Sequence, residues 1–231
     1  MTLADAPAKT AVVTGASSGI GEATARHLLD AGWRVTGMSR RPPKITDAAF
    51  TWIDVDLGDF DHLASAAAAL GANDAVVHAA GLQHAAPLGA LDPAHSEQMW
   101  RIHVGAAEVL VDALAPTLRD GARIVLLGSR TMTGNPGKSQ YAATKAALAG
   151  MARSWAAELL GRAITVNVVA PGPTDTPMLT DPARHGVPPK LPPLGRFIEP
   201  AEVAALIGFL LGPHGGSITG QTIVQCAGAS L

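Results

Sequence analysis

The sequence predicts an α/β fold in which one parallel β-sheet is covered by helices on both faces, and three observations support this. Short runs rich in β-branched residues alternate along the chain with Ala- and Leu-rich stretches of helical spacing. The runs are nearly continuous in apolar residues, as expected for strands that are buried on both faces. A glycine-rich turn joins the first run directly to the first helical stretch, as in a strand–turn–helix unit.

The predicted elements follow one another in a regular order. Seven strands are predicted at residues 11–14, 34–37, 50–53, 75–78, 123–127, 164–169 and 222–224. Five helices are predicted at residues 19–31, 59–70, 97–118, 141–160 and 200–211. Prolines cluster between residues 171 and 200, in a stretch too long for a plain connection. We therefore expect residues 173–199 to form a lid over a substrate pocket.

The composition agrees with a single domain that spans residues 1–231. The chain is 48% hydrophobic and 16% charged, which excludes disorder for most of it. Its 17 Lys and Arg residues against 19 Asp and Glu residues give a net charge of −2, unlike a general nucleic-acid-binding protein. No apolar run approaches the ~18–20 residues of a membrane span, and the N-terminal residues resemble no secretory signal. We expect a soluble, cytoplasmic protein.

Metal and disulfide sites are not expected. Cys226 is the only cysteine, which excludes an intramolecular disulfide and a zinc site with several cysteines, and we interpret it as a small buried hydrophobe. The histidines outside the motifs described below are scattered, and none has the spacing of a metal-binding pair.

The turn after the first strand carries the first functional signal. It reads G-A-S-S-G-I-G at residues 15–21, a G-x-x-x-G-x-G spacing that differs from the general G-x-G-x-x-G pattern. Its glycines permit a tight turn and let backbone N–H groups approach a pyrophosphate, while the following helix adds a partial positive charge. Because the turn lies between a buried strand and an amphipathic helix, it predicts a dinucleotide phosphate site.

The end of the second strand predicts which dinucleotide binds. It reads Met38, Ser39, Arg40, Arg41, and no acidic residue occurs from residue 34 to residue 44. An acidic residue here would accept from the ribose 2′-hydroxyl of NAD, whereas arginine pairs with the 2′-phosphate of NADP. The two arginines indicate NADP(H); the alternative is a solvated basic loop.

Two aspartates follow the third strand, in the sequence D-V-D-L-G-D. At this turn a carboxylate can accept from the adenine amino group, but aspartate is also a common helix N-cap. We expect one of Asp56 and Asp59 to contact the adenine and the other to cap the helix.

The chemical signal lies between residues 128 and 145. Ser129 ends a buried strand, which places its hydroxyl at the carboxyl edge of the sheet where such folds bind ligands. Tyr141, the only tyrosine, and Lys145 are four residues apart and share one face of a helix. An ammonium one turn away favours the phenolate and lowers the phenol pKa, so the phenol can exchange a proton with a substrate oxygen.

Together these residues resemble the short-chain dehydrogenase/reductase family over nearly the whole chain. The glycine motif T-G-A-S-S-G-I-G occupies residues 14–21, and the D-[VL]-x-[DN] motif reads D-L-G-D at residues 56–59. The N-[NA]-A-G motif appears as H-A-A-G at residues 78–81, and Ser129 and Y-x-x-x-K match the active-site motifs. P-G occurs at residues 171–172 with Thr176 behind it, and I-T-G-Q occurs at residues 218–221.

The resemblance implies a Rossmann-like, doubly wound sheet of seven parallel strands and hydride transfer between a carbonyl and an alcohol with a nicotinamide cofactor. It makes Tyr141 the general acid/base, gives Lys145 the tasks of lowering the Tyr141 pKa and holding the nicotinamide ribose, and lets Ser129 orient the substrate oxygen. The cofactor-binding residues predicted in all are Gly15, Ser17, Ser18, Gly19, Ile20, Gly21, Ser39, Arg40, Arg41, Asp56, Leu57, Ala79, Ala80, Gly81, Tyr141, Lys145, Pro171, Gly172, Thr174 and Thr176.

Two positions depart from the family pattern. His103 stands where the family has an asparagine that feeds a water-mediated proton relay to the lysine. An imidazole can hold a water and titrates near neutrality, so His103 is either a catalytic relay residue or a histidine that only packs in the helix. His78 replaces the first asparagine of the N-[NA]-A-G motif, and we expect it to affect stability or cofactor affinity rather than catalysis.

We therefore expect an NADP(H)-dependent oxidoreductase that interconverts a ketone or aldehyde and an alcohol, similar to 3-oxoacyl reductases and sugar dehydrogenases. The alternative is a dinucleotide-binding sensor or scaffold with little turnover. The lid, residues 178–197, carries the basic residues Arg184, His185, Lys190 and Arg196, and an anionic substrate or a solvated lid would both suit them. Helices 97–118 and 141–160 are apolar on more than one face, which predicts a homotetramer, or a homodimer as the alternative.

Overall fold

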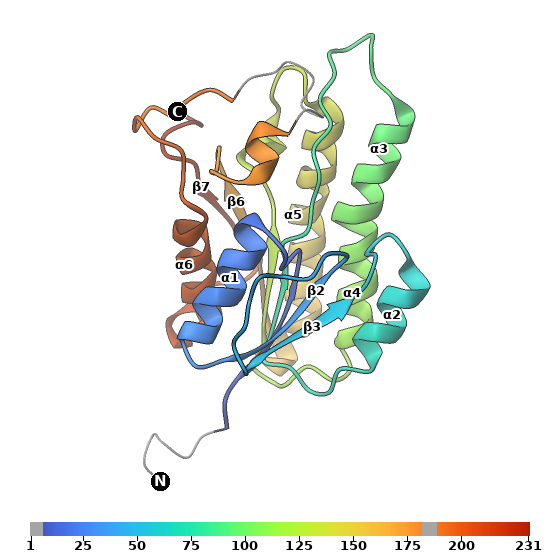
Figure 1. Cartoon of the computed structure of the whole chain (residues 1–231), viewed down its shortest axis with the longest axis vertical. Coiled ribbons are helices and arrows are strands. Elements are labelled where there is room, and N and C mark those ends of the chain that lie inside the picture. The colour runs from blue at the N-terminus through green and yellow to red at the C-terminus, as the bar shows by residue number, and fades with distance from the viewer. Residues whose placement is uncertain (1–6, 182–188) are drawn as a thin grey trace.

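The structure is a computed structural model that describes residues 7–181 and 189–231. A seven-stranded parallel sheet forms its centre, with the strand order β3-β2-β1-β4-β5-β6-β7 (Figure 1). The strands are β1 (Thr10–Thr14), β2 (Arg34–Ser39), β3 (Phe50–Asp54), β4 (Ala75–His78), β5 (Arg123–Leu127), β6 (Thr165–Pro171) and β7 (Thr222–Gln225). The predicted fold class is confirmed, and each predicted strand is present with ends within two residues of those expected.

The strand order reverses direction beside β1. The chain builds outward from β1 to β2 and β3, then crosses back so that β4 pairs with the other side of β1. In open α/β sheets the connections diverge at such a switch point and leave a crevice outside the carboxyl ends of the strands. The residues that follow β1, β4 and β5 therefore meet at one edge of the sheet.

The helices cover both faces of the sheet. They are α1 (Gly19–Asp30), α2 (Phe60–Ala68), α3 (Pro93–Trp100), α4 (Ala106–Leu114), α5 (Ser139–Leu159) and α6 (Pro200–Leu211). α1 and α6 pack together on one face, and α2, α4 and α5 cover the other (Figure 1). In the part of the chain that the structure describes, no helix is long and apolar enough to cross a membrane.

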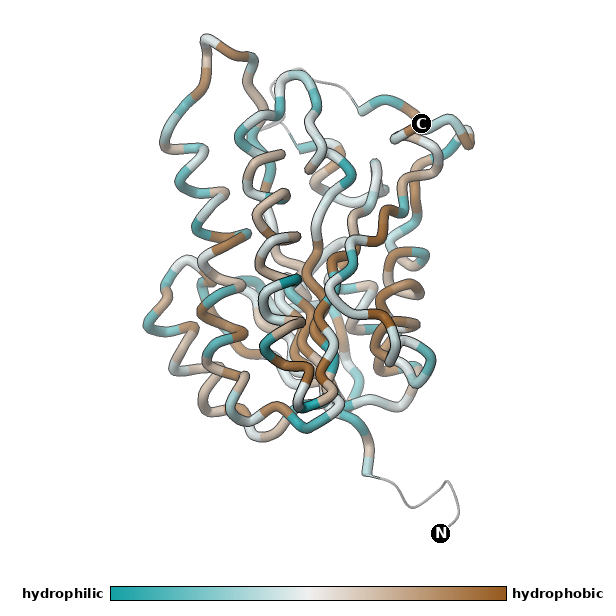
Figure 2. The backbone as a smooth tube through the Cα atoms, turned by 180° about the vertical axis from the view of Figure 1, so that it is seen from behind, coloured by the Kyte–Doolittle hydropathy of each residue, from teal (hydrophilic) through white to brown (hydrophobic). Residues whose placement is uncertain are grey.

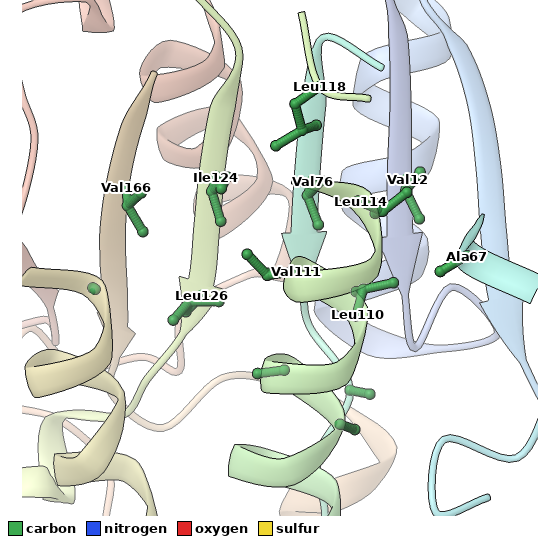
Figure 3. Packing of buried hydrophobic residues seen from close by; sticks show 14 of the residues in the cluster. Val12, Ala67, Val76, Leu110, Val111, Leu114, Leu118, Ile124, Leu126 and Val166 are labelled. Atoms are coloured by element: carbon green, nitrogen blue, oxygen red, sulfur yellow. The ribbon is translucent and has the colours of Figure 1, made fainter. Parts of the chain in front are cut away.

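One face of the core is a row of aliphatic side chains from four neighbouring strands. Val12, Val76, Ile124 and Val166 occupy matching positions in the strand register, and α4 places its apolar side chains against this face of the sheet (Figure 3). Burying one such side chain contributes roughly 1.5–3 kcal/mol. The alternate residues of the same strands pack against α1 and α6. The apolar strands therefore lie in the middle of the molecule, where Figure 2 shows the backbone in brown.

The predicted helix 97–118 needs correction. The helical segment begins earlier, at Pro93, and its regular part ends at Leu114. Asp92 is the N-cap, and its side chain accepts from the Ala94 backbone N–H at 2.8 Å. A π-turn, η1 (Arg101–Gly105), separates α3 from α4. A π-turn is one extra residue inserted into a helix, frequently at a functional site, and periodicity alone does not reveal it. Here it surrounds His103, which is fully buried.

His78 joins β1, β4 and the π-turn. Its Nε2 lies 3.0 Å from the Ile102 carbonyl oxygen, which can only accept, so Nε2 carries the proton. Its Nδ1, 3.1 Å from the Thr14 hydroxyl, therefore accepts from Thr14. The Thr14 oxygen in turn accepts from the backbone N–H groups of Ala79 and Ala80. Every polar atom of this buried network is satisfied while the imidazole stays neutral.

The His78 network makes the stability of the fold sensitive to acid. Burial first, and then the charge of Lys145, lower the pKa of His78 from 6.5 to about 4. The unfolded chain therefore binds more protons than the folded protein between these pH values, so stability that is present above pH 6.5 is lost as the pH falls toward 4. A shift of this size corresponds to about 3 kcal/mol.

We predict that His78→Asn flattens the pH dependence of the free energy of unfolding between pH 7 and pH 4.5, as measured by urea titration. His214→Asn, at an exposed position, is the matched control and should keep the wild-type slope. Equal slopes for the wild-type protein and His78→Asn would contradict the assignment of a neutral, buried imidazole.

Candidate active site

A cavity of about 670 Å³ opens at the carboxyl edge of the sheet. Each residue that the sequence predicts to bind the cofactor lines it, from the glycine turn after β1 to the loop after β6. Ser129, Tyr141 and Lys145 line the same cavity, whereas His103 does not. The fold thus brings the predicted phosphate, ribose and chemical residues together around one space.

The glycine turn has a backbone conformation that leaves no room for a side chain at two of its glycines. Gly15 has a φ of +68°, and a Cβ there would lie 2.9 Å from the Cα of Ala80. A Cβ on Gly21 would lie 2.3 Å from the carbonyl oxygen of Gly15. Ser18 precedes α1, and its hydroxyl makes no capping hydrogen bond. The first N–H groups of α1 therefore face the cavity edge without a side-chain cap, as a bound phosphate would require.

The turn after β2 is held from two sides. The Ser39 hydroxyl donates to the Arg41 carbonyl at 2.8 Å, and the Trp52 indole N–H donates to the Ser39 carbonyl at 3.0 Å. Arg40 and Arg41 are exposed at the cavity wall. Their backbone is therefore fixed while their side chains are available to an anion.

The structure divides the two aspartates as the sequence could not. Asp59 is the N-cap of α2 and accepts from the His62 backbone N–H at 3.0 Å. Asp56 lines the cavity, and its Oδ1 accepts from the Gly58 N–H at 2.9 Å. Of the two aspartates, Asp56 is thus the one that lines the cavity.

Ser129 is fixed at the end of β5 by a short helical turn, η2 (Arg130–Thr133). Its Oγ accepts from the Thr131 backbone N–H at 3.2 Å and lies 2.9 Å from the Thr131 hydroxyl. These contacts restrict the side chain to one orientation at the carboxyl edge of the sheet. A hydroxyl held in this way can donate to a substrate oxygen.

Tyr141 and Lys145 lie on one face of α5 and are both buried. The Lys145 Nζ donates to the Leu127 carbonyl at 2.7 Å and lies 5.9 Å from the centre of the Tyr141 ring. Burial lowers the pKa of Lys145 to about 7. Lys145 can therefore gain or lose a proton near neutral pH, and a nearby anion favours its charged form.

The loop after β6 lines the cavity. Thr174 is buried, its hydroxyl donates to the Gly172 carbonyl at 3.0 Å, and it bridges to Ile198 across the loop. Thr176 lies over the phosphate turn, where a Cβ on Gly19 would be 3.2 Å from its Cγ2. The predicted lid residues Arg184 and His185 lie outside the described residues.

Both ring nitrogens of His103 have protein partners. The Leu82 backbone N–H donates to Nε2 at 3.1 Å, so Nε2 carries no proton. Nδ1 therefore donates to the Thr144 hydroxyl at 2.8 Å, and Thr144 donates to the Tyr141 carbonyl at 2.9 Å. Burial first, then the charges of Lys145 and His78, hold the pKa of His103 well below its usual value. The geometry favours the packing alternative, and a relay role stays a prediction.

Sequence reasoning missed several polar residues that line the cavity. Gln83, Arg101, Arg130 and Lys138 belong to no motif of the resemblance. Arg101 donates from Nε to the Gly58 carbonyl at 2.8 Å, which places it beside the Asp56 turn. Arg130 follows Ser129 directly, and this position at a strand end is the signal that could have identified it.

Comparison with known proteins places the chain in a family. The family described as enoyl-(acyl carrier protein) reductase matches residues 15–230. The 2,3-dihydro-2,3-dihydroxybenzoate dehydrogenase of Escherichia coli is 34% identical, with 98% of this chain and 99% of that protein covered. The 3-oxoacyl-[acyl-carrier-protein] reductase of Thermotoga maritima is 31% identical, with 93% and 95% covered.

Solved structures agree with this placement. A blue fluorescent protein from a metagenomic library, in complex with NADPH, superposes with a TM-score of 0.85 at 31% identity and covers 96% of this chain and 98% of its own. A 3-ketoacyl-(acyl-carrier-protein) reductase from Brucella melitensis, in complex with NADH, has a TM-score of 0.86 at 25% identity and covers 96% and 98%.

Fold and relatives define the protein as an oxidoreductase. The chain belongs to the short-chain dehydrogenase/reductase family, whose members act on CH–OH groups, and the resemblance predicted from its motifs is confirmed. Across residues 7–181 and 189–231, no group of three or more metal-ligating side chains is present.

We predict that His103→Asn retains the reduction rate to within about tenfold, because the amide oxygen can still accept from the Leu82 N–H. His103→Leu removes both hydrogen bonds and should lower the rate roughly a hundredfold, because a small displacement of α5 misplaces the residues it carries. The decisive measurement is the pH profile of kcat. A wild-type inflection that disappears in His103→Asn would contradict the packing alternative and support the relay role.

Proposed function

We propose that the protein is an NADP(H)-dependent oxidoreductase that interconverts a ketone or aldehyde and the corresponding alcohol. The observation that supports this most directly is the burial of Ser129, Tyr141 and Lys145 around one end of a cavity whose other end carries the phosphate turn. A bound nicotinamide would supply or accept the hydride. The remaining chemistry is a proton transfer at the substrate oxygen.

In this mechanism Ser129 donates a hydrogen bond to the substrate oxygen, and Tyr141 gives that oxygen its proton during reduction or takes it during oxidation. The ammonium of Lys145 favours the ionised phenol and is fixed by the Leu127 carbonyl. Because the Lys145 pKa is about 7, a negatively charged dinucleotide bound nearby would keep this residue protonated. His103 and Thr144 hold the backbone of α5 in place.

Arg40 and Arg41 support the proposed preference for NADP(H) over NAD(H). They are exposed on a fixed turn at the cavity wall, and the described cavity wall has a single carboxylate, that of Asp56. Relatives with NADPH and with NADH both superpose on this chain, so the choice depends on these side chains rather than on the fold.

A homotetramer and a lid are parts of the same proposal. The exposed face of α5 carries small residues, among them Ala143, Ala146 and Gly150, which permit close packing of a second helix. Thr174 and Thr176 line the cavity, and this supports a lid formed by their loop over a bound cofactor and a substrate.

Replacing Tyr141 with Phe tests the mechanism. Tyr141→Phe removes the proton donor and should lower the rate of carbonyl reduction by at least about a thousandfold. The dissociation constant of NADPH should stay within about threefold of wild type, as measured by fluorescence titration. Turnover that survives the change would refute the role of Tyr141, whereas tight NADPH binding by a wild-type protein that reduces no carbonyl would support a sensor.

Replacing both arginines tests the cofactor choice. In Arg40→Met/Arg41→Met the dissociation constant of NADPH should rise at least about tenfold, because two charged contacts to a phosphate are lost, and that of NADH should change little. Arg34→Met, an exposed arginine at the opposite edge of the sheet, is the matched control. An equal loss of affinity for both dinucleotides would exclude recognition of the 2′-phosphate.

A further inference from the structure

The catalytic end of the cavity contains two buried hydrogen-bond donors that lack acceptors. The Nε of Arg130 and the side-chain amide nitrogen of Gln83 are both shielded from solvent, and neither has a hydrogen-bond partner within residues 7–181 and 189–231. Both residues line the cavity that also contains Ser129 and Tyr141. A buried donor left unpaired costs free energy, so such atoms in a cavity wall indicate where a ligand supplies the acceptor.

The two donors come from loops that the fold positions independently. Arg130 follows Ser129 after β5, and Gln83 follows Leu82, whose backbone N–H is held by His103 after β4. β4 and β5 are neighbouring strands, so both residues lie at the same part of the sheet edge. The glycine turn follows β1 and the two arginines follow β2, which places the cofactor's phosphate contacts on other strands.

The local charge is also unbalanced. Among the described residues Arg130 pairs with no carboxylate. In the described part of the cavity wall the carboxylate of Asp56 follows β3, at the far edge of the sheet. Lys138 and Lys145 also line this cavity and add basic groups to its wall. Field lines in such a cleft attract an anion.

We propose that Arg130 and Gln83 form a subsite for a carboxylate of the substrate, so that the preferred substrates are oxo or hydroxy acids. This inference rests on the proposed function and names the substrate class for that site. A guanidinium offers a planar pair of donors that matches a carboxylate, and the amide of Gln83 adds a third N–H. The carboxylate would anchor the molecule while Ser129 and Tyr141 contact its carbonyl oxygen.

The test compares each carboxylate substrate with its uncharged methyl ester. Levulinate and 3- and 4-oxocyclohexanecarboxylate are each paired with their methyl esters, and the ratio of kcat/KM for acid over ester is measured with NADPH. We expect the wild-type ratio to be at least about ten, since a site built for hydrogen bonding discriminates against a ligand that lacks the group. Arg130→Met should lower the ratio at least about tenfold, Gln83→Leu should lower it less, and Arg34→Met should leave it unchanged.

A binding measurement keeps this inference separate from the proposed function. With NADP⁺ present, cyclohexanecarboxylate should bind the wild-type protein about tenfold more tightly than cyclohexanecarboxamide, and Arg130→Met should remove the difference. Carboxylate binding that depends on Arg130, in a protein that reduces no ketone, would support the subsite and refute the proposed function.

Other outcomes would overturn the subsite. Turnover with an acid-to-ester ratio that Arg130→Met does not change would exclude it. Weaker NADPH binding in Arg130→Met, with that ratio unchanged, would assign Arg130 to the cofactor instead. Because Arg130→Met could alter the turn after Ser129, Arg130→Lys serves as a second variant and should retain part of the preference, since it keeps the charge and loses the planar donor pair.

Discussion

The hydroxyl of Thr14 is the contact on which the geometry of the site depends. It lies at the end of β1, donates to His78 and accepts from the N–H groups of Ala79 and Ala80. It therefore fixes the two loops that leave the sheet at its switch point, and His78 extends the same network to the π-turn. The hydrogen bonds at the carboxyl ends of β1 and β4, beside the crevice, are therefore fully satisfied without a ligand.

The helix α5 carries two of the three proposed catalytic residues and is bonded to other elements of the fold. Tyr141, Thr144 and Lys145 lie within five residues of each other, and Thr144 and Lys145 are bonded to different parts of the fold. Lys145 is held by β5, and Thr144 connects α5 to the π-turn through His103. A shift of α5 would therefore break contacts with two other elements, so the phenol and the ammonium keep their positions relative to Ser129.

Burial determines which of the basic groups at the site carry charge. His78 and His103 are enclosed and bonded in neutral form, whereas Lys145 has a pKa of about 7 and can respond to a ligand. The Nε of Arg130 has no hydrogen-bond partner in the described part of the chain. The site thus combines fixed neutral hydrogen bonds with positive charges that face the cavity.

The sequence by itself determined the sheet, the glycine turn and the set of Ser129, Tyr141 and Lys145, because strand and helix periods and local turn chemistry are properties of neighbouring residues. Tertiary structure alone decided which of Asp56 and Asp59 caps a helix, where the π-turn interrupts residues 93–114, and how His103 is bonded. It also revealed Gln83 and Arg130 at one cavity. These features depend on contacts between residues far apart in the chain, which no local pattern encodes.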